Sequence, residues 1–180
     1  RLLEVLPQVG GKEALDAVVS RFEGGSGDTK GAAFRALVQW RGPEAADRLF
    51  AIVSAGEPAY RDMAFGGFVR QIGMSSLPDE QKVLQLRRVL PLAKSANERR
   101  MIIRSLQRTK TFQAFLVASS LMDDAEVAND AAGAVMTIAL PAAGEKNGLT
   151  GKLVRNALER VIQVLTGGES DYDKENIKRY

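Results

Sequence analysis

The feature of this sequence that most constrains its fold is a set of apolar residues that recurs about every thirty residues. One set of equivalent positions is spaced by 31, 31, 38 and 32 residues: Leu3, Phe34, Phe65, Ile103 and Val135. A second set follows the first in register: Leu6, Leu37, Phe68, Leu106 and Ile138. A period of roughly 20 to 50 residues is typical of stacked supersecondary units, none of which buries its apolar face alone. The period therefore predicts a repeat protein that presents a binding surface rather than a catalytic pocket.

Helical periodicity with capping signals runs along the chain, and no strand alternation interrupts it. A short first helix is expected over residues 1–9, ended by the pair Gly10-Gly11. The spacing then predicts four helix pairs and a last helix, near residues 12–41, 43–72, 78–108, 111–140 and 151–165. We thus expect an all-α fold, an α-solenoid of about four antiparallel helix pairs. Residues 1–166 would form the repeat domain, and residues 167–180 a linker to a following domain.

Several helix starts carry a residue pattern that predicts a capping box, in which side chains satisfy free backbone N–H groups. The pairs are Ser76 with Asp79, Ser95 with Glu98, and Asp123 with Glu126. Pro91 should end or kink the helix predicted over residues 78–92, because proline removes a helical hydrogen bond.

The helix pairs resemble HEAT or HEAT-like repeats. The best copy is the alanine-rich segment 125–135, with weaker copies at Arg35-Ala36-Leu37 and Arg104-Ser105-Leu106. The resemblance implies close packing of second helices through small residues and a concave surface lined by those helices. Tetratricopeptide and ankyrin repeats fit less well, because the chain lacks their signature residues.

The closing segment Asp171–Tyr180 is similar to a junction found in large bacterial secreted proteins. There, a HEAT-like region precedes a 3-keto-disaccharide hydrolase domain. That resemblance implies a piece of a longer, exported protein, periplasmic or secreted, in which this segment accompanies a carbohydrate-active domain.

Composition excludes several kinds of chemistry. The chain has no cysteine and no histidine, so it has no disulfide, no thiolate or imidazole metal ligand and no Ser-His-Asp or Cys-His centre. No constellation predicts catalysis, a metal site or a cofactor, and no apolar run approaches the roughly 20 residues that a membrane span needs. We therefore expect a non-catalytic scaffold whose partner is another protein or a neighbouring domain.

Basic residues concentrate in one block, which predicts the binding surface. Residues 81–110 carry a net charge of +8, against +3 for the whole chain. Arg100, Arg104 and Arg108 lie four apart, so they share one face of a helix whose opposite face carries apolar residues. Guanidinium groups bind carboxylate and phosphate through paired hydrogen bonds, so these three arginines predict a site for an acidic ligand.

Two alternatives compete with this hypothesis. The arginines can instead form ion pairs with acids on flanking units, such as Asp62 or Asp130, or simply remain solvated. Nucleic acid is the other candidate ligand, but a phosphate-tracking stripe needs basic residues on neighbouring units as well. Trp40 and Tyr60 are too isolated to stack bases, and we expect both to pack in the core.

Overall fold

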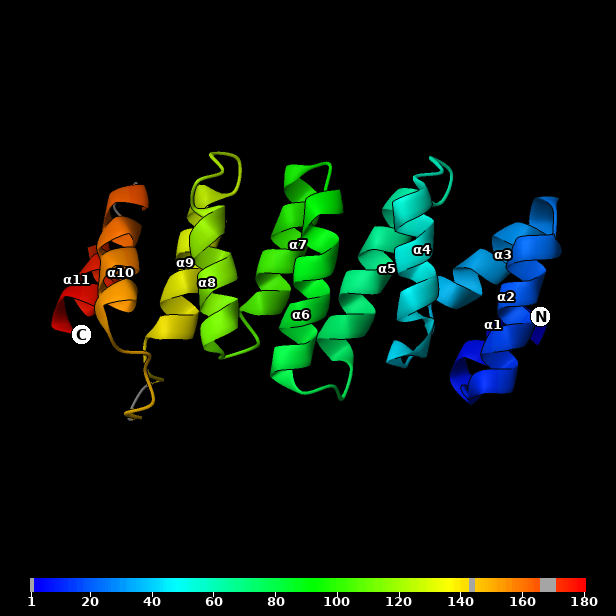
Figure 1. Ribbon diagram of the computed structural model, residues 1–180, viewed down its shortest axis with the longest axis horizontal. Helices are drawn as coiled ribbons and strands as arrows, with labels where there is room; N and C mark the ends of the chain where they lie inside the picture. Colours follow the sequence, from blue (N-terminus) through cyan, green and yellow to red (C-terminus); the bar gives the residue numbers. More distant parts are fainter. Residues whose placement is uncertain (1, 143–144, 166–170) are drawn as a thin grey trace. The chain divides into compact units, whose positions relative to one another are not determined.

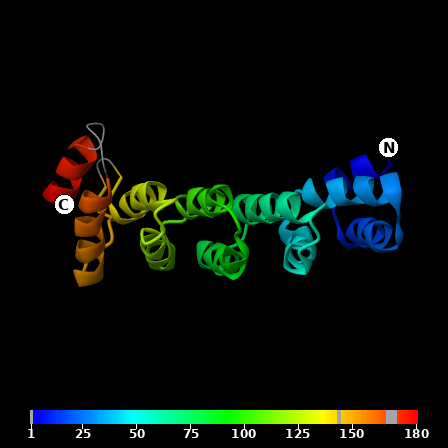
Figure 2. The same cartoon turned by 90° about the horizontal axis from the view of Figure 1, so that it is seen from above.

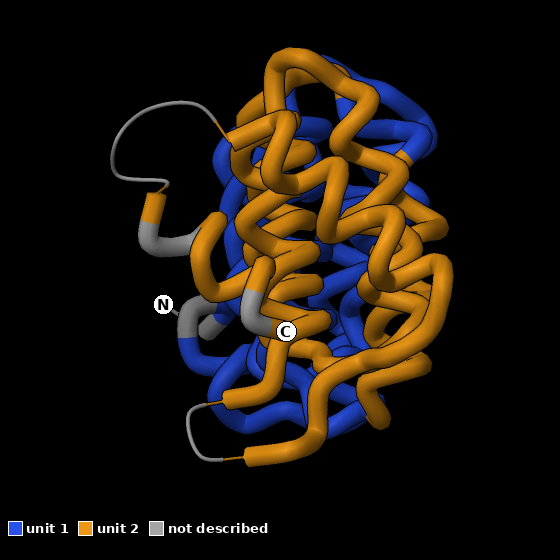
Figure 3. The backbone as a smooth tube through the Cα atoms, turned by 90° about the vertical axis from the view of Figure 1, so that its left-hand side faces the viewer, with its two compact units in different colours: residues 1–77, 91–93 blue, residues 78–90, 94–180 orange. Residues whose placement is uncertain are grey.

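The computed structural model describes residues 2–142, 145–165 and 171–180, and over these residues it is helical without any strand. Helices make up 74% of the structure. The chain divides into two compact units, residues 1–77 with 91–93, and residues 78–90 with 94–180 (Figure 3). The all-α prediction is confirmed.

The first unit contains five α-helices and a short 3-10 turn. In chain order they are α1 (Leu2–Val9), α2 (Lys12–Gly24), α3 (Gly27–Val38), η1 (Pro43–Ala45), α4 (Ala46–Ala55) and α5 (Arg61–Met74) (Figure 1). Each helix packs on its neighbour in sequence, and α1 and α5 both contact α3 as well. An aromatic cluster of Phe22, Phe34 and Tyr60 helps to join them, with ring centroids 4.8 to 5.9 Å apart.

The second unit contains the remaining α-helices. They are α6 (Asp79–Val89), α7 (Ala96–Leu106), α8 (Phe112–Leu121), α9 (Ala128–Ala139), α10 (Lys152–Val164) and α11 (Asp171–Arg179). The 3-10 turn η2 (Leu90–Leu92) follows α6 directly. Besides neighbours in sequence, α6 packs on α8 and α7 on α9, so these four helices form two layers (Figure 2).

The repeating apolar positions occupy equivalent places in the fold. They lie on alternate helices, α1, α3, α5, α7 and α9. On α3, α5, α7 and α9 all eight are at most 3% exposed. The period in the sequence therefore follows every second helix, and from α3 to α9 its residues are buried in the cores of the two compact units.

Helix positions follow the prediction, with ends displaced by up to three residues. Pro43 begins a 3-10 turn rather than α4 itself, and Pro91 lies in η2 just beyond the end of α6, as its missing N–H requires. Gly10 adopts a left-handed conformation (φ 69°) after α1, and its N–H donates to the Leu6 carbonyl at 3.0 Å. The glycine C-cap predicted there is confirmed.

One predicted capping box forms and the other two do not. Ser95 Oγ accepts from the backbone N–H of Glu98 at 3.3 Å, and Glu98 Oε2 accepts from the N–H of Lys94 at 2.6 Å. The prediction for Ser76 is wrong, because α6 begins after Pro78 and no side chain caps it. Pro78 fixes an extended backbone immediately before α6, so the helix begins too late for Ser76 to reach it.

The prediction of a capping box at Asp123 and Glu126 is also wrong. Residues 125–127 form a turn, and α9 begins only at Ala128. The N–H of Glu126 donates to Oδ1 of Asp124 at 3.1 Å, a local Asx-type contact that competes with helix formation. Asp123 instead forms an ion pair with Arg160 of α10.

The segment predicted as a linker contains a helix. Residues 171–179 form α11, which packs on α10 and buries Ile177 to 8% exposure. Residues 167–170, the rest of that predicted linker apart from Tyr180, lie outside the described residues. The hydroxyl of Tyr180 donates a hydrogen bond to the carbonyl of Leu149, in the segment before α10. Residues 171–180 therefore fold as part of the second unit.

Candidate functional site

The predicted arginine surface lies on α7 and the turn that follows it, and one face of this helix is buried. Ile102, Ile103 and Leu106 are at most 1% exposed and hold α7 against its neighbours. Because α7 contacts α6, α8 and α9, the charged side of the helix is left for solvent and for residues at the edge of α9. The structure therefore places Arg100 and Arg104 on the side of α7 opposite the core, as the spacing predicted. The prediction that Arg108 shares this helix face is wrong, because α7 ends at Leu106 and Arg108 lies beyond it.

Arg100 forms an ion pair with a residue of the next helix pair. Its Nε lies 2.9 Å from Oδ2 of Asp130 on α9, and its guanidinium also donates to the carbonyl of Glu126 at 2.8 Å. Both side chains of the pair are more than a third exposed, 38% for Arg100 and 37% for Asp130. The pairing with Asp130 considered from the sequence is confirmed, so Arg100 ties α7 to the start of α9.

The neighbouring Arg99 is engaged more completely. Its Nε lies 2.6 Å from Oδ2 of Asp124, and a terminal nitrogen pairs with Glu126. Its side chain is only 17% exposed. The carboxylates of Asp124 and Glu126, in the turn before α9, thus neutralise the charge of Arg99 near the start of α7.

Arg104 and Arg108 remain exposed. Neither side chain forms an ion pair or hydrogen bond with any residue that the structure describes. Arg104 lies in the last turn of α7, whereas Arg108 follows the helix in a turn, beyond Gln107. The three predicted site residues therefore divide into one arginine held by Asp130 and two with free guanidinium groups.

Other basic and acidic residues considered from the sequence are accounted for separately. Asp62 pairs with its neighbour Arg61, the guanidinium nitrogen and Oδ1 being 2.8 Å apart. Arg61 is buried, 3% exposed, and donates to the Leu92 carbonyl, so it belongs to the core of the first unit rather than to a phosphate stripe. Trp40 is 2% exposed, which confirms its core position, while Tyr60 is half-buried in the aromatic cluster.

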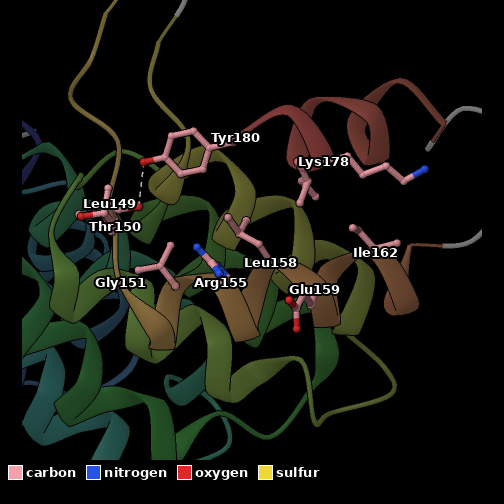
Figure 4. A pocket seen from close by; sticks show the side chains of 11 residues that line it. Leu149, Thr150, Gly151, Arg155, Leu158, Glu159, Ile162, Lys178 and Tyr180 are labelled. Carbon is pink, nitrogen blue, oxygen red and sulfur yellow. Dashed lines mark hydrogen bonds between the residues drawn. The ribbon is translucent and has the colours of Figure 1, made fainter.

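A groove that sequence reasoning missed lies between α10 and α11. It has a volume of about 540 Å³, within the range of small-molecule pockets. Its lining includes the apolar residues Val154, Leu158 and Ile177. The charged residues Arg155, Glu159 and Lys178 also line it (Figure 4). The groove depends on α11, which the sequence pattern did not reveal.

Tyr180 closes one end of this groove. Its hydroxyl donates to the carbonyl of Leu149 at 2.9 Å (Figure 4). A Cβ at Gly148 would lie 2.3 Å from the same hydroxyl oxygen and 2.8 Å from the ring carbon Cζ. The contact joins the end of α11 to the strap before α10. A glycine at position 148 is what allows the ring to lie there.

The described residues offer few other chemical features. Within residues 2–142, 145–165 and 171–180, no three acidic side chains gather where they could hold a metal ion. Across the same residues, no helix is long and apolar enough to cross a bilayer.

Comparison of the chain with models of known protein families, with curated proteins and with solved structures found no match.

Proposed function

We propose that this chain is a non-catalytic helical-repeat scaffold of the HEAT-like, α-solenoid kind, which binds an acidic protein segment or neighbouring domain. The observation that carries the proposal is the exposure of Arg104 and Arg108 beside a partly exposed Arg100. Repeat scaffolds bind along the surface of successive equivalent helices, and the packing of α7 on α9 supports such an arrangement. The contact surface proposed here is the charged side of α7.

Charge supports an acidic partner. Arg104 in the last turn of α7, and Arg108 and Lys110 beyond the end of the helix, are exposed, and Asp130 is the acid that already holds Arg100. A carboxylate-bearing ligand adds attraction at the two free guanidinium groups and competes with Asp130 only at the third. Binding of this kind weakens as salt screens the charges, with a Debye length of about 10 Å at 0.1 M.

The test uses an oligo-glutamate peptide as a defined acidic probe. We expect the intact chain to bind it at about 50 mM salt and to lose most of that binding at about 500 mM. The double variant Arg104→Ala with Arg108→Ala should weaken binding several-fold. The matched control is Arg87→Ala with Arg88→Ala, which removes the same charge from exposed positions on α6, in the other layer.

Two outcomes contradict the proposal. Equal loss of binding in the two double variants means that net charge, and not the surface of α7, attracts the probe. Binding of duplex DNA at the same low salt that exceeds binding of the acidic peptide assigns the basic residues to nucleic acid instead.

A further inference from the structure

The first unit contains a hollow that the proposed function does not use. It lies where α3 ends beside α5 and has a volume of about 430 Å³. Three of its lining residues follow α3, and three belong to the last turns of α5: Gln39, Trp40, Arg41, Arg70, Gln71 and Met74. All six lie within one compact unit.

Gln71, one of the residues that line this hollow, carries an unsatisfied hydrogen-bond acceptor. The side chain is 2% exposed, and its Nε2 donates to the carbonyl of Leu37 at 2.8 Å and to that of Val38 at 3.4 Å. Its Oε1 is buried and accepts no hydrogen bond from any residue that the structure describes. A buried polar atom without a partner is costly, so this oxygen calls for a donor from outside the chain.

The amide cannot satisfy Oε1 by turning over. A turned amide would place Oε1 against the carbonyl oxygens of Leu37 and Val38, which carry no proton to donate. It would also leave Nε2 without its two acceptors. The end of α3 therefore fixes the amide in the orientation that leaves Oε1 without a partner.

The charged residues of the hollow favour an anion. Arg41 and Arg70 line it, both are exposed, and no acidic side chain is among the lining residues described. One terminal N–H group of Arg70 donates to the carbonyl of Val38, and the other N–H groups of this guanidinium are left for a ligand. Arg41 makes no side-chain hydrogen bond or ion pair with any described residue.

We propose that this hollow binds an oxyanion that carries its own proton, namely hydrogen phosphate or a phosphoryl group. The anionic oxygens would accept from Arg41 and Arg70, and the P–O–H group would donate to Oε1 of Gln71. Sulfate has the same shape and charge as hydrogen phosphate but no proton, so it leaves Oε1 unsatisfied. The proposal is independent of the acidic-partner surface on α7.

Trp40 supplies the measurement, because it is the only tryptophan in the chain and lines the hollow. Its fluorescence, excited where tyrosine absorbs little, is followed at constant ionic strength while inorganic phosphate or sulfate is added. We expect a saturable change with phosphate and at least a tenfold weaker response to sulfate. Equal responses to the two anions, or none to either, overturn the proposal.

Phosphoserine distinguishes free phosphate from a phosphoryl group borne by a larger molecule. Its phosphate has a second pKa of about 6, so it keeps a proton at pH 5.5 and has lost it at pH 7.5. If the site takes phosphoryl groups, phosphoserine binds more tightly than inorganic phosphate at the lower pH and weakens as pH rises. If it takes the free ion, inorganic phosphate binds more tightly at both pH values.

Two variants locate the response in the hollow. Arg41→Gln should weaken phosphate binding at least fivefold, and the matched control Arg48→Gln, an exposed arginine on α4 outside the lining, should leave it unchanged. Gln71→Met should reduce the preference for phosphate over sulfate. If Gln71→Met does not fold, the Arg41 variant and the comparison of phosphate with sulfate still test the proposal. Equal weakening of phosphate binding by the Arg41 and Arg48 variants would overturn the assignment of the site to this hollow.

Discussion

Arg100 of α7 and Asp130 of α9 join the second helices of consecutive helix pairs, with Nε and Oδ2 2.9 Å apart. The pair lies at the surface, where solvent screens the charges and two long side chains must be held still. Exposed pairs of this kind contribute about 0.2–1 kcal/mol.

We expect a double-mutant cycle of Arg100→Ala and Asp130→Ala to give a coupling energy of about 0.5 kcal/mol. The measurement is urea unfolding followed by circular dichroism. The comparison cycle is Arg48 with Glu23, whose charged atoms are 3.6 Å apart and whose side chains are more exposed. A coupling energy for Arg100 and Asp130 no larger than in that cycle would show that the bridge does not hold α7 to α9.

Removing the N-cap of α7 should destabilise the second unit. Ser95→Ala leaves the N–H of Glu98 without its acceptor, and loss of a serine cap costs about 1 kcal/mol. Ser76→Ala is the matched control, since Ser76 is exposed and caps no helix. Thermal unfolding of the two variants checks the difference, and equal midpoints would contradict the assignment of the cap.

The buried Arg61 should contribute to stability through the carbonyl that it satisfies. Arg61→Met keeps much of the side-chain volume but leaves the Leu92 oxygen without this donor, at a cost of about 1–3 kcal/mol. Asp62→Asn serves as the control, because the Asp62 side chain is 85% exposed and its removal should change the free energy of unfolding little. A similar loss in both variants would mean that the ion pair, rather than the backbone contact, matters.

Two helical glycines should respond oppositely to larger side chains. A Cβ at Gly67 on α5 would lie 3.2 Å from both Leu49 and Val38, so Gly67→Leu overpacks the first unit and costs about 1–3 kcal/mol or more. A Cβ at Gly133 on α9 meets nothing within 4 Å, and Gly133→Ala should stabilise the chain by about 0.5–1 kcal/mol. Chemical denaturation measures both, and a stabilising Gly67→Leu would refute the close packing of α5.

Most of the fold could be predicted from the sequence, because apolar residues at helical spacing record which face each helix buries. Phe65 and Phe68 show this well, since both lie at repeat positions and both are fully buried. Helix ends were less certain. Pro78 and Asp124 decide two of them through local backbone geometry, which a search for serine and acid pairs does not detect.

Helix α11 could not be predicted, because its sequence is almost entirely polar and charged. Ile177 is its one aliphatic residue, so no helical periodicity can be recognised, and the helix is stabilised by docking on α10. The groove beside it was missed for the same reason.

For the arginine surface, spacing correctly placed Arg100 and Arg104 opposite the buried face of α7, but it extended the helix to Arg108, which lies beyond the end of α7. It could not tell which guanidinium groups would find an acid, since that depends on the turn before α9. Arg61 shows the same limit, because its burial follows from a carbonyl 31 residues away along the chain.

The inward face of α9 is built largely from alanine, with Ala131, Ala132 and Ala134 fully buried against its neighbours. An alanine has no rotatable side-chain torsion to lose when it becomes ordered, whereas a buried leucine or methionine gives up about 0.5–2 kcal/mol of rotational freedom. The alanines of this helix therefore dock without an entropic penalty from their side chains, and on this face the penalty falls on Val135 and Ile138. Because alanine side chains are short, the backbone of α9 lies close to its neighbours α8 and α10. The shape of that backbone therefore sets the distance between α8 and α10.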